Sequence, residues 1–168
     1  MKLMWLALAA VIVGLDQLTK VLAVQFLKPI DTKPLIEGVL HLTYLENRGA
    51  AFGMLADHRW VFMVTSTIAI LGILIFMVAG LKKHYDPLLW CGLAFIAGGG
   101  FGNMIDRVAL GYVVDFVDFR LINFAIFNTA DTFVCIGCGL AMLWVITSEI
   151  REKKQKTAAD HSDSPISE

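Results

Sequence analysis

The chain has 168 residues, of which 57% are hydrophobic and only 17% are charged, and its mean hydropathy is +0.68. Soluble domains of this size are normally much less apolar, so the composition indicates an integral membrane protein. The formal net charge of −1 gives no electrostatic basis for nucleic-acid binding, so we expect no nucleic-acid partner.

Four apolar segments are long enough to cross a bilayer as helices, which takes roughly 20 residues. The predicted transmembrane helices are residues 4–24, 60–81, 88–107 and 129–149. The apolar run after Lys2 also resembles a secretory signal, but Asp16 and Gln17 stand where a small-residue cleavage site would be needed. We therefore expect this segment to remain in the protein as its first helix.

The connection after the first helix predicts a small β-sheet. Apolar and polar side chains alternate from Leu40 to Tyr44, and the pattern ends at turn residues 47–49. This alternation suits a sheet at about residues 35–55 that rests on the membrane surface, with one apolar face and one wet face.

The connection after the third helix contains GYVVDFVDF, residues 111–119. If this segment is extended, Asp115 and Asp118 point to opposite faces, because successive side chains alternate along a strand. Only one of the two acids can then face a common site.

Polar residues recur at the ends of the apolar segments, where they normally face a bundle interior or a cavity and are therefore functional candidates. Asp16 and Lys20 have the spacing of an intrahelical ion pair, and a supporting role is at least as plausible for them as a catalytic one. Arg107 has two interpretations, since it could clamp a substrate carbonyl or phosphate or could pair with Asp106. The remaining candidates are Asn103, Asn128 and Asp131.

Asn128 and Asp131 also fit a helix start. Asn is a favoured N-cap, and an acid three residues later resembles a capping box. An acid in the first turn is also stabilised in its ionised form by the helix dipole.

Two carboxylates in different environments are what an aspartyl hydrolase needs, one ionised to accept a proton from water and one protonated to donate to the substrate. We assign Asp131 as the base and Asp115 as the acid, although a coupled pair can exchange these roles during turnover. The histidines lack metal-ligand spacing, and Cys135 and Cys138 have no second ligand pair, so we expect no metal and no cofactor.

Five separated motifs, in order along the chain, carry a resemblance to the lipoprotein signal peptidase family, also called signal peptidase II. They are DQLTK at 16–20, NRGAAFG at 47–53, GGGFGNMIDR at 98–107, VVDFVDF at 113–119 and FNTAD at 127–131. One small departure is Ala125, where the family often has Pro, and it affects only the local loop geometry.

The resemblance implies a membrane aspartyl endopeptidase with four transmembrane helices, a small extracytoplasmic β-sheet that cradles the substrate, and a short periplasmic loop or helix. It implies that Asp115 and Asp131 are the catalytic pair and that Asn47, Asn103, Arg107 and Asn128 line the substrate cleft. The supporting residues are Asp16, Lys20, Gly49, Asp106 and Ala130. The implied substrate is a prolipoprotein that carries diacylglyceryl on a cysteine, and the enzyme cuts just before that cysteine.

We expect one integral-membrane peptidase domain, residues 1–154, and a disordered cytoplasmic tail, residues 155–168. Lys and Arg residues near the helix ends favour cytoplasmic termini. The resemblance implies the inner membrane of a bacterium, with the active site near the periplasmic face. We expect a monomer in contact with membrane lipids. The alternatives are a small proton- or ion-coupled transporter that uses intramembrane carboxylates, and a non-catalytic scaffold whose acids cap helices.

Overall fold

The computed structural model describes residues 3–49, 59–80 and 86–162. It contains four long helices, one short helix and three strands. In chain order these are α1 (Leu3–Phe26), β1 (Thr32–Ile36), β2 (Leu40–Asn47), α2 (Arg59–Ala79), α3 (Pro87–Ala109), β3 (Val113–Phe119), the 3-10 helix η4 (Arg120–Ile122) and α4 (Thr129–Ser162).

Three helical stretches are long and apolar enough to cross a membrane, namely Leu3–Phe26, Pro87–Ala109 and Thr129–Thr157. In α2 the described apolar stretch is shorter and covers Val64–Ala79. The fold class is therefore a mostly helical membrane protein with a small antiparallel sheet.

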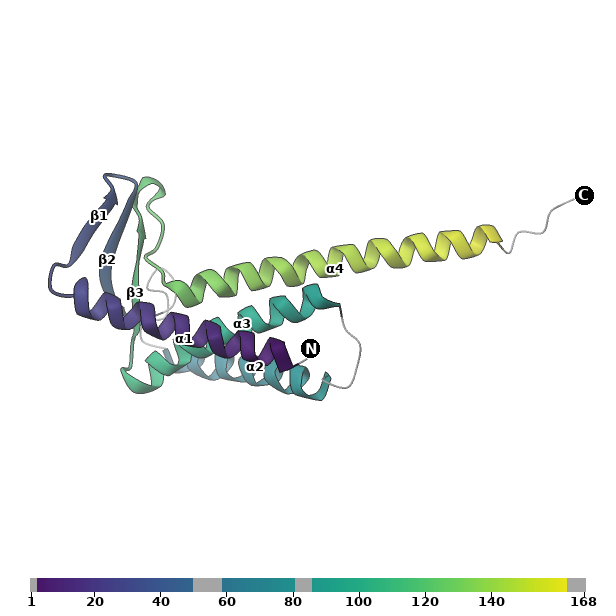
Figure 1. The fold of residues 1–168 in the computed structure, drawn as a ribbon, viewed down its shortest axis with the longest axis horizontal. Helices are drawn as coiled ribbons and strands as arrows, with labels where there is room; N and C mark the ends of the chain where they lie inside the picture. The colour runs from purple at the N-terminus through teal and green to yellow at the C-terminus, as the bar shows by residue number, and fades with distance from the viewer. Residues whose placement is uncertain (1–2, 50–58, 81–85, 163–168) are drawn as a thin grey trace, which may run out of the picture.

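Helix α3 is the centre of the bundle and packs against the other three long helices. Small residues allow the closest approach, because a Cβ on Gly92 would lie only 2.9 Å from the carbonyl oxygen of Gly137 in α4. Such small-residue contacts let helix backbones pack closely in membranes. The sheet lies at one end of the bundle, and α1 begins and α4 ends toward the opposite end (Figure 1).

The sheet has the order β1-β2-β3, and both strand pairs are antiparallel. The prediction of a sheet within residues 35–55 was incomplete, because the third strand comes from the second connection, far along the chain. Pairing of Leu42 with Val117 and of Leu45 with Asp115, with a register shift between them, joins the two connections. The part of the predicted sheet at residues 50–55 lies outside the described residues.

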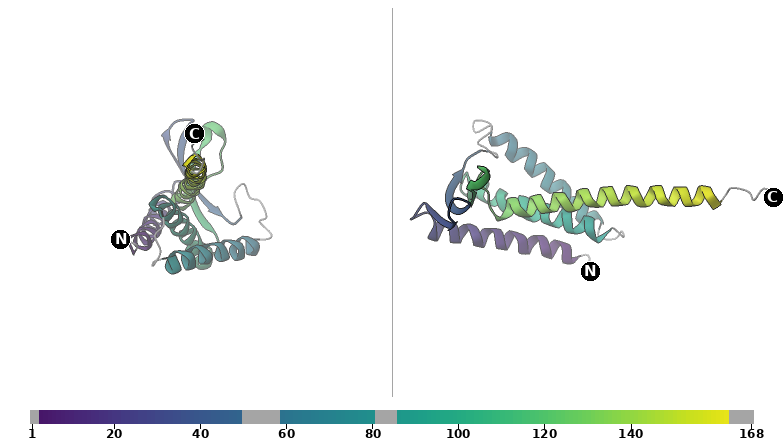
Figure 2. Two further views of the ribbon diagram at one scale, coloured as in Figure 1. Left: turned by 90° about the vertical axis from the view of Figure 1, so that its right-hand side faces the viewer. Right: turned by 90° about the horizontal axis from the view of Figure 1, so that it is seen from above.

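One apolar cluster attaches the sheet to the bundle. It contains Ala23 and Leu27 at the end of α1 and Val114 and Phe116 of β3, all buried. The right-hand view of Figure 2 places the sheet at the same end of the bundle as the start of α4. This arrangement brings β3 next to the first turn of α4.

The prediction of a disordered tail from residue 155 was wrong for its first part, because α4 continues to Ser162. Residues 149–156 are rich in Lys, Glu and Arg, which have good helix propensity. Extending an existing helix also avoids the cost of nucleating a new one.

Candidate active site

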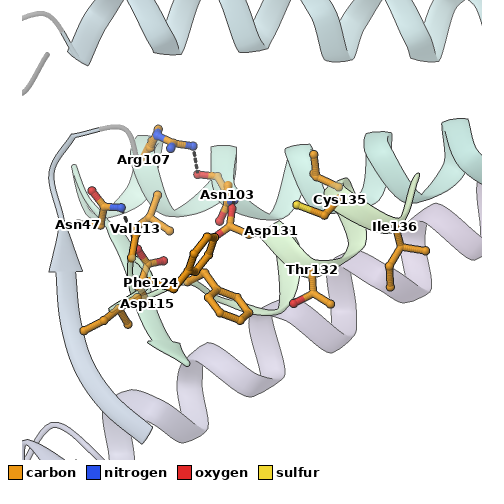
Figure 3. A pocket seen from close by; sticks show the side chains of 14 residues that line it. Asn47, Asn103, Arg107, Val113, Asp115, Phe124, Asp131, Thr132, Cys135 and Ile136 are labelled. Atoms are coloured by element: carbon orange, nitrogen blue, oxygen red, sulfur yellow. Dashed lines mark hydrogen bonds between the residues drawn. The ribbon is translucent and has the colours of Figure 1, made fainter. Parts of the chain in front are cut away.

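A cavity of about 490 Å³ opens between β3, α3 and the first turns of α4. Five polar residues that the sequence singled out line it, namely Asn47, Asn103, Arg107, Asp115 and Asp131. Figure 3 shows that they come from different elements and gather on one side of the cavity. The rest of the lining is mainly apolar and includes Val113, Phe124, Ile126, Phe127, Val134 and Ile136.

Asp115 lies in the middle of β3 and is 1% exposed. Its Oδ1 accepts a hydrogen bond from Nδ2 of Asn128 at 2.6 Å, and its Oδ2 accepts one from Nδ2 of Asn47 at 2.8 Å. The backbone N–H of Gly49 donates to Oδ1 of Asn47 at 3.0 Å, which fixes the orientation of that amide. Gly49 thus contacts the site through its backbone N–H, by way of Asn47.

Burial raises the pKa of the Asp115 carboxyl to about 6. The hydrogen bonds from Asn47 and Asn128 act in the opposite direction, and the negative charge of Asp131 adds to the upward shift. The proton therefore stays on this carboxyl to a much higher pH than on an exposed aspartic acid.

Asp131 lies in the first turn of α4, which Asn128 caps. The backbone N–H of Asp131 donates to Oδ1 of Asn128 at 3.0 Å, and the backbone N–H of Asn128 donates to Oδ2 of Asp131 at 3.2 Å. This reciprocal pair confirms the predicted capping box. The other carboxylate oxygen, Oδ1, accepts a hydrogen bond from Nδ2 of Asn103 at 2.8 Å.

Asn128 connects the two acids and is fully buried. Its Nδ2 donates to Asp115 and also to Oδ1 of Asn103 at 3.0 Å, while its Oδ1 and backbone N–H hold Asp131. One asparagine therefore fixes the position of the helix start relative to the strand. Asn128 is not among the residues that line the cavity, and it contacts both acids from the protein interior.

Asp16, Lys20 and Asp106 form a buried ionic cluster between α1 and α3. The ammonium of Lys20 lies 2.8 Å from Oδ2 of Asp16 and 3.1 Å from Oδ2 of Asp106. The predicted ion pair of Asp16 and Lys20 is thus present. Asp16 also accepts a hydrogen bond from the backbone N–H of Ala130 at 3.0 Å, which ties α1 to the start of α4.

Arg107 takes part in the cavity and not in this cluster. Its Nη1 donates to the carbonyl oxygen of Asn103 at 3.4 Å, and Asp106 is the ion-pair partner of Lys20. The predicted alternative in which Arg107 pairs with Asp106 is therefore not observed. Its side chain lines the cavity, with the guanidinium next to Asn103 (Figure 3).

Gln17 is a site residue that the sequence reasoning did not single out. Its Nε2 donates to Oδ1 of Asp106 at 2.9 Å and to the carbonyl oxygen of Gly102 at 3.2 Å. Only its place in the DQLTK motif could have pointed to it. Gly102 itself leaves room for Asp16, since a Cβ there would collide with the Asp16 carboxylate.

Asp118 points away from the other acids, as strand alternation predicts. It accepts hydrogen bonds from Oγ1 of Thr43 at 2.7 Å and from Nε of Arg120 at 2.8 Å. Burial alone would raise the pKa of Asp118, but the hydrogen bonds from Arg120 and Thr43 outweigh burial and hold it below its usual value. Among the described residues, no three His, Cys, Asp or Glu side chains are grouped as metal ligands would be.

The fold and the site define a membrane protein with a polar cleft that is lined by two acids, one from strand β3 and one from helix α4. The family model for signal peptidase (SPase) II matches residues 8–147. The lipoprotein signal peptidase of Brevibacillus brevis is 46% identical over 83% of this chain and 93% of its own length. That of Clostridioides difficile is 38% identical over 90% of this chain and 100% of its own length.

Two solved structures, both described as bacterial membrane enzymes determined by the in meso method, have the same fold. The first has a TM-score of 0.76 at 28% identity and covers 98% of this chain and 93% of its own. The second has a TM-score of 0.73 at 30% identity and covers 84% of this chain and 92% of its own. The chain belongs to the signal peptidase II family, and its activity is that of a peptidase.

Proposed function

We propose that this protein is an aspartyl endopeptidase that removes signal peptides from diacylglyceryl-modified prolipoproteins, with Asp115 and Asp131 as its catalytic pair. One observation carries the proposal: two carboxylates from β3 and α4 line the same cavity, and Asn128 donates a hydrogen bond to each, from Nδ2 to Asp115 and from its backbone N–H to Asp131. General acid and base groups must lie within hydrogen-bond reach of one bound water and one substrate carbonyl, and this arrangement supplies both.

The two acids differ in the way that the reaction requires. Asp115 is buried and its raised pKa, about 6, suits a carboxyl that donates a proton to the substrate carbonyl oxygen. Asp131 accepts N–H donors on both oxygens and lies at the positive end of a helix, which suits the ionised base. In the first step Asp131 takes a proton from water while the carbonyl oxygen receives the Asp115 proton. The roles then reverse as the amine leaves.

The apolar part of the cavity supports a lipid-bearing substrate. Phe124, Ile126, Val134 and Ile136 offer a surface for a signal-peptide backbone or an acyl chain next to the acids. Asn47, Asn103 and Arg107 offer polar contacts for the peptide on the opposite side. Cleavage just before the lipidated cysteine fits a substrate that remains in the bilayer while its scissile bond reaches the acid pair.

We also propose that α2 is a fourth membrane span and that both termini face the cytoplasm. Support comes from the positions of α1 and α4, whose outer ends lie away from the sheet (Figure 1), and from Arg151, Lys153 and Lys154 near the end of α4. The sheet and the acid pair are then near the periplasmic face of the inner membrane. The enzyme acts as a monomer, because one chain supplies both acids. Membership of a peptidase family gives the transporter alternative no support.

The test replaces each acid separately by Asn in the purified enzyme. Asp115→Asn and Asp131→Asn are each expected to abolish cleavage of a lipidated precursor while the protein still folds and inserts. Asp118→Asn is the matched control, because its side chain faces Thr43 and Arg120 and is expected to leave substantial activity. Retained cleavage in either of the first two variants would rule out the acid pair.

A further inference from the structure

Lys20 is a buried cation next to the acid pair to which the reaction assigns no step. It lies on α1 and is 3% exposed. Its ammonium contacts three oxygens, those of Asp16, Asp106 and Asn103, the last at 2.8 Å. An ammonium has three N–H donors and no acceptor, so every donor of Lys20 is in use.

The contact with Asn103 determines which way that amide faces. Because Lys20 can only donate, the atom of Asn103 that faces it must be the carbonyl oxygen. The NH₂ group of Asn103 is then directed at Oδ1 of Asp131, 2.8 Å away. Asn128 donates to the same carbonyl oxygen at 3.0 Å, but it is neutral, whereas hydrogen bonds from charged donors are roughly twice as strong.

A cation on the carbonyl oxygen also polarises the amide. Hydrogen bonds in a chain strengthen one another, so the bond from Lys20 makes the NH₂ group of Asn103 a better donor to Asp131. An NH₂ group cannot accept, and it therefore favours Asp131 in its ionised state.

We propose that Lys20 is a positioning residue for the acid pair, which orients and polarises the Asn103 amide so that Asp131 remains the ionised partner. This inference rests on the proposed function, since it presumes that Asp131 acts as the base. Among the described residues, the ion pairs of Lys20 are with Asp16 and Asp106 and not with Asp115 or Asp131. Lys20 therefore acts on Asp131 through Asn103.

Several other charged or titratable groups surround Asp131 and belong to the same electrostatic setting. They are Asp16 on α1, Asp106 and Arg107 on α3, Asp115 on β3 and Cys135 on α4. Of these, Asp115 is the other acid of the proposed pair. Asp16 and Asp106 are negative and contact Lys20, so the loss of Lys20 exposes Asp131 to two carboxylates without their cation.

The experiment measures kcat and KM across pH for cleavage of a lipidated precursor by the purified enzyme and by Lys20→Met. We expect kcat to fall by about one to two orders of magnitude with KM changed little. The acid limb of the profile should move to higher pH, because the loss of Lys20 removes a positive charge near the acid pair and leaves the Asn103 amide free to turn.

Asp16→Asn is the matched control. It removes one carboxylate from Lys20, keeps an oxygen for the N–H of Ala130, and leaves Lys20 on Asn103, so its acid limb should stay at the wild-type position. Lys20→Met alone leaves two buried carboxylates without their cation and can fail to fold. The double variant Lys20→Met/Asp16→Asn removes the cation together with one of its two carboxylates, so the net charge of the cluster is unchanged, and it carries the test in that case.

A merely structural Lys20 would lower thermal stability but leave the acid limb of the folded enzyme in place, and that result would overturn the proposal. Asp115→Asn and Asp131→Asn are assayed on the same substrate. Cleavage by either would remove the proposed function itself. If both are inactive and the Lys20 variants show no shift, the acid pair stands and only the role of Lys20 fails.

Discussion

Asp115 should make the protein less stable as pH rises. Its pKa is about 6 in the folded protein, against 3.8 for an ordinary aspartic acid, so the folded state holds the proton more tightly than the unfolded state does. For such a group, stability is full below the unfolded pKa and is lost as pH rises through the folded pKa. A shift of this size corresponds to about 3 kcal/mol, and Asp115 is too buried for solvent to screen it.

Asp115→Asn removes this titration. The free energy of unfolding of the variant, relative to that of the wild type, should therefore rise by up to about 3 kcal/mol between pH 4 and pH 7. Any constant penalty from placing an amide against Asn47 and Asn128 cancels in this comparison, since only the change with pH is used. In melting temperature the relative gain should be roughly 5–10 °C.

Asp118→Asn is the control with the opposite sign. The pKa of Asp118 is held below its usual value, so its contribution to stability is present above the unfolded pKa and is lost as the pH falls. Relative to wild type, this variant should lose stability as pH rises from about 3 toward 5.

The assay is thermal unfolding in detergent at closely spaced pH values, with wild type and both variants in the same buffers. Two acids three residues apart on one strand should give difference curves of opposite slope. A flat difference curve for Asp115→Asn would refute the reasoning that burial raises its pKa, as would a slope of the same sign in both variants.

Two further predictions concern the helix contact and the substrate. Gly92→Ala should lower the free energy of unfolding by about 1–3 kcal/mol, because its Cβ would meet the carbonyl oxygen of Gly137. Gly14→Ala is the control, since nothing lies within 4 Å of the added carbon; thermal melts that rank the two equally would contradict the close packing. In a purified assay, a lipidated precursor should be cleaved and the same unlipidated sequence should not. Equal cleavage rates for the two precursors would contradict the proposal that the apolar cavity wall binds the lipid-bearing part of the substrate.

Local signals in the sequence predicted the helices well. Apolar segments free of charge gave α3 and the start of α4 within a few residues, and the capping residues Asn128 and Asp131 marked where α4 begins. The end of α4 was not predictable in this way, because a polar, charged segment has the same composition whether it continues a helix or is unstructured.

The candidate site was predictable residue by residue but not in its connections. The pairing of β2 with β3 joins residues that lie 66 (Asn47 and Val113) to 79 (Leu40 and Phe119) positions apart in the chain. The hydrogen bond from Asn47 to Asp115 spans a separation of 68. No spacing rule reports such contacts. The role of Asn128 as a bridge was hidden for the same reason, since its capping function alone accounts for its presence in the sequence.

The hydrogen bonds and ion pairs that join α1, α3 and β3 also position the acid pair. Asp106 accepts a hydrogen bond from the backbone N–H of Val114, the residue before Asp115, while its other contacts are Lys20 and Gln17. The ionic cluster therefore fixes β3 against α3 at the point where the strand presents its acid. Because Asn103 joins this cluster to Asp131, a change in the distance between α1 and α3 must alter the positions of both carboxylates.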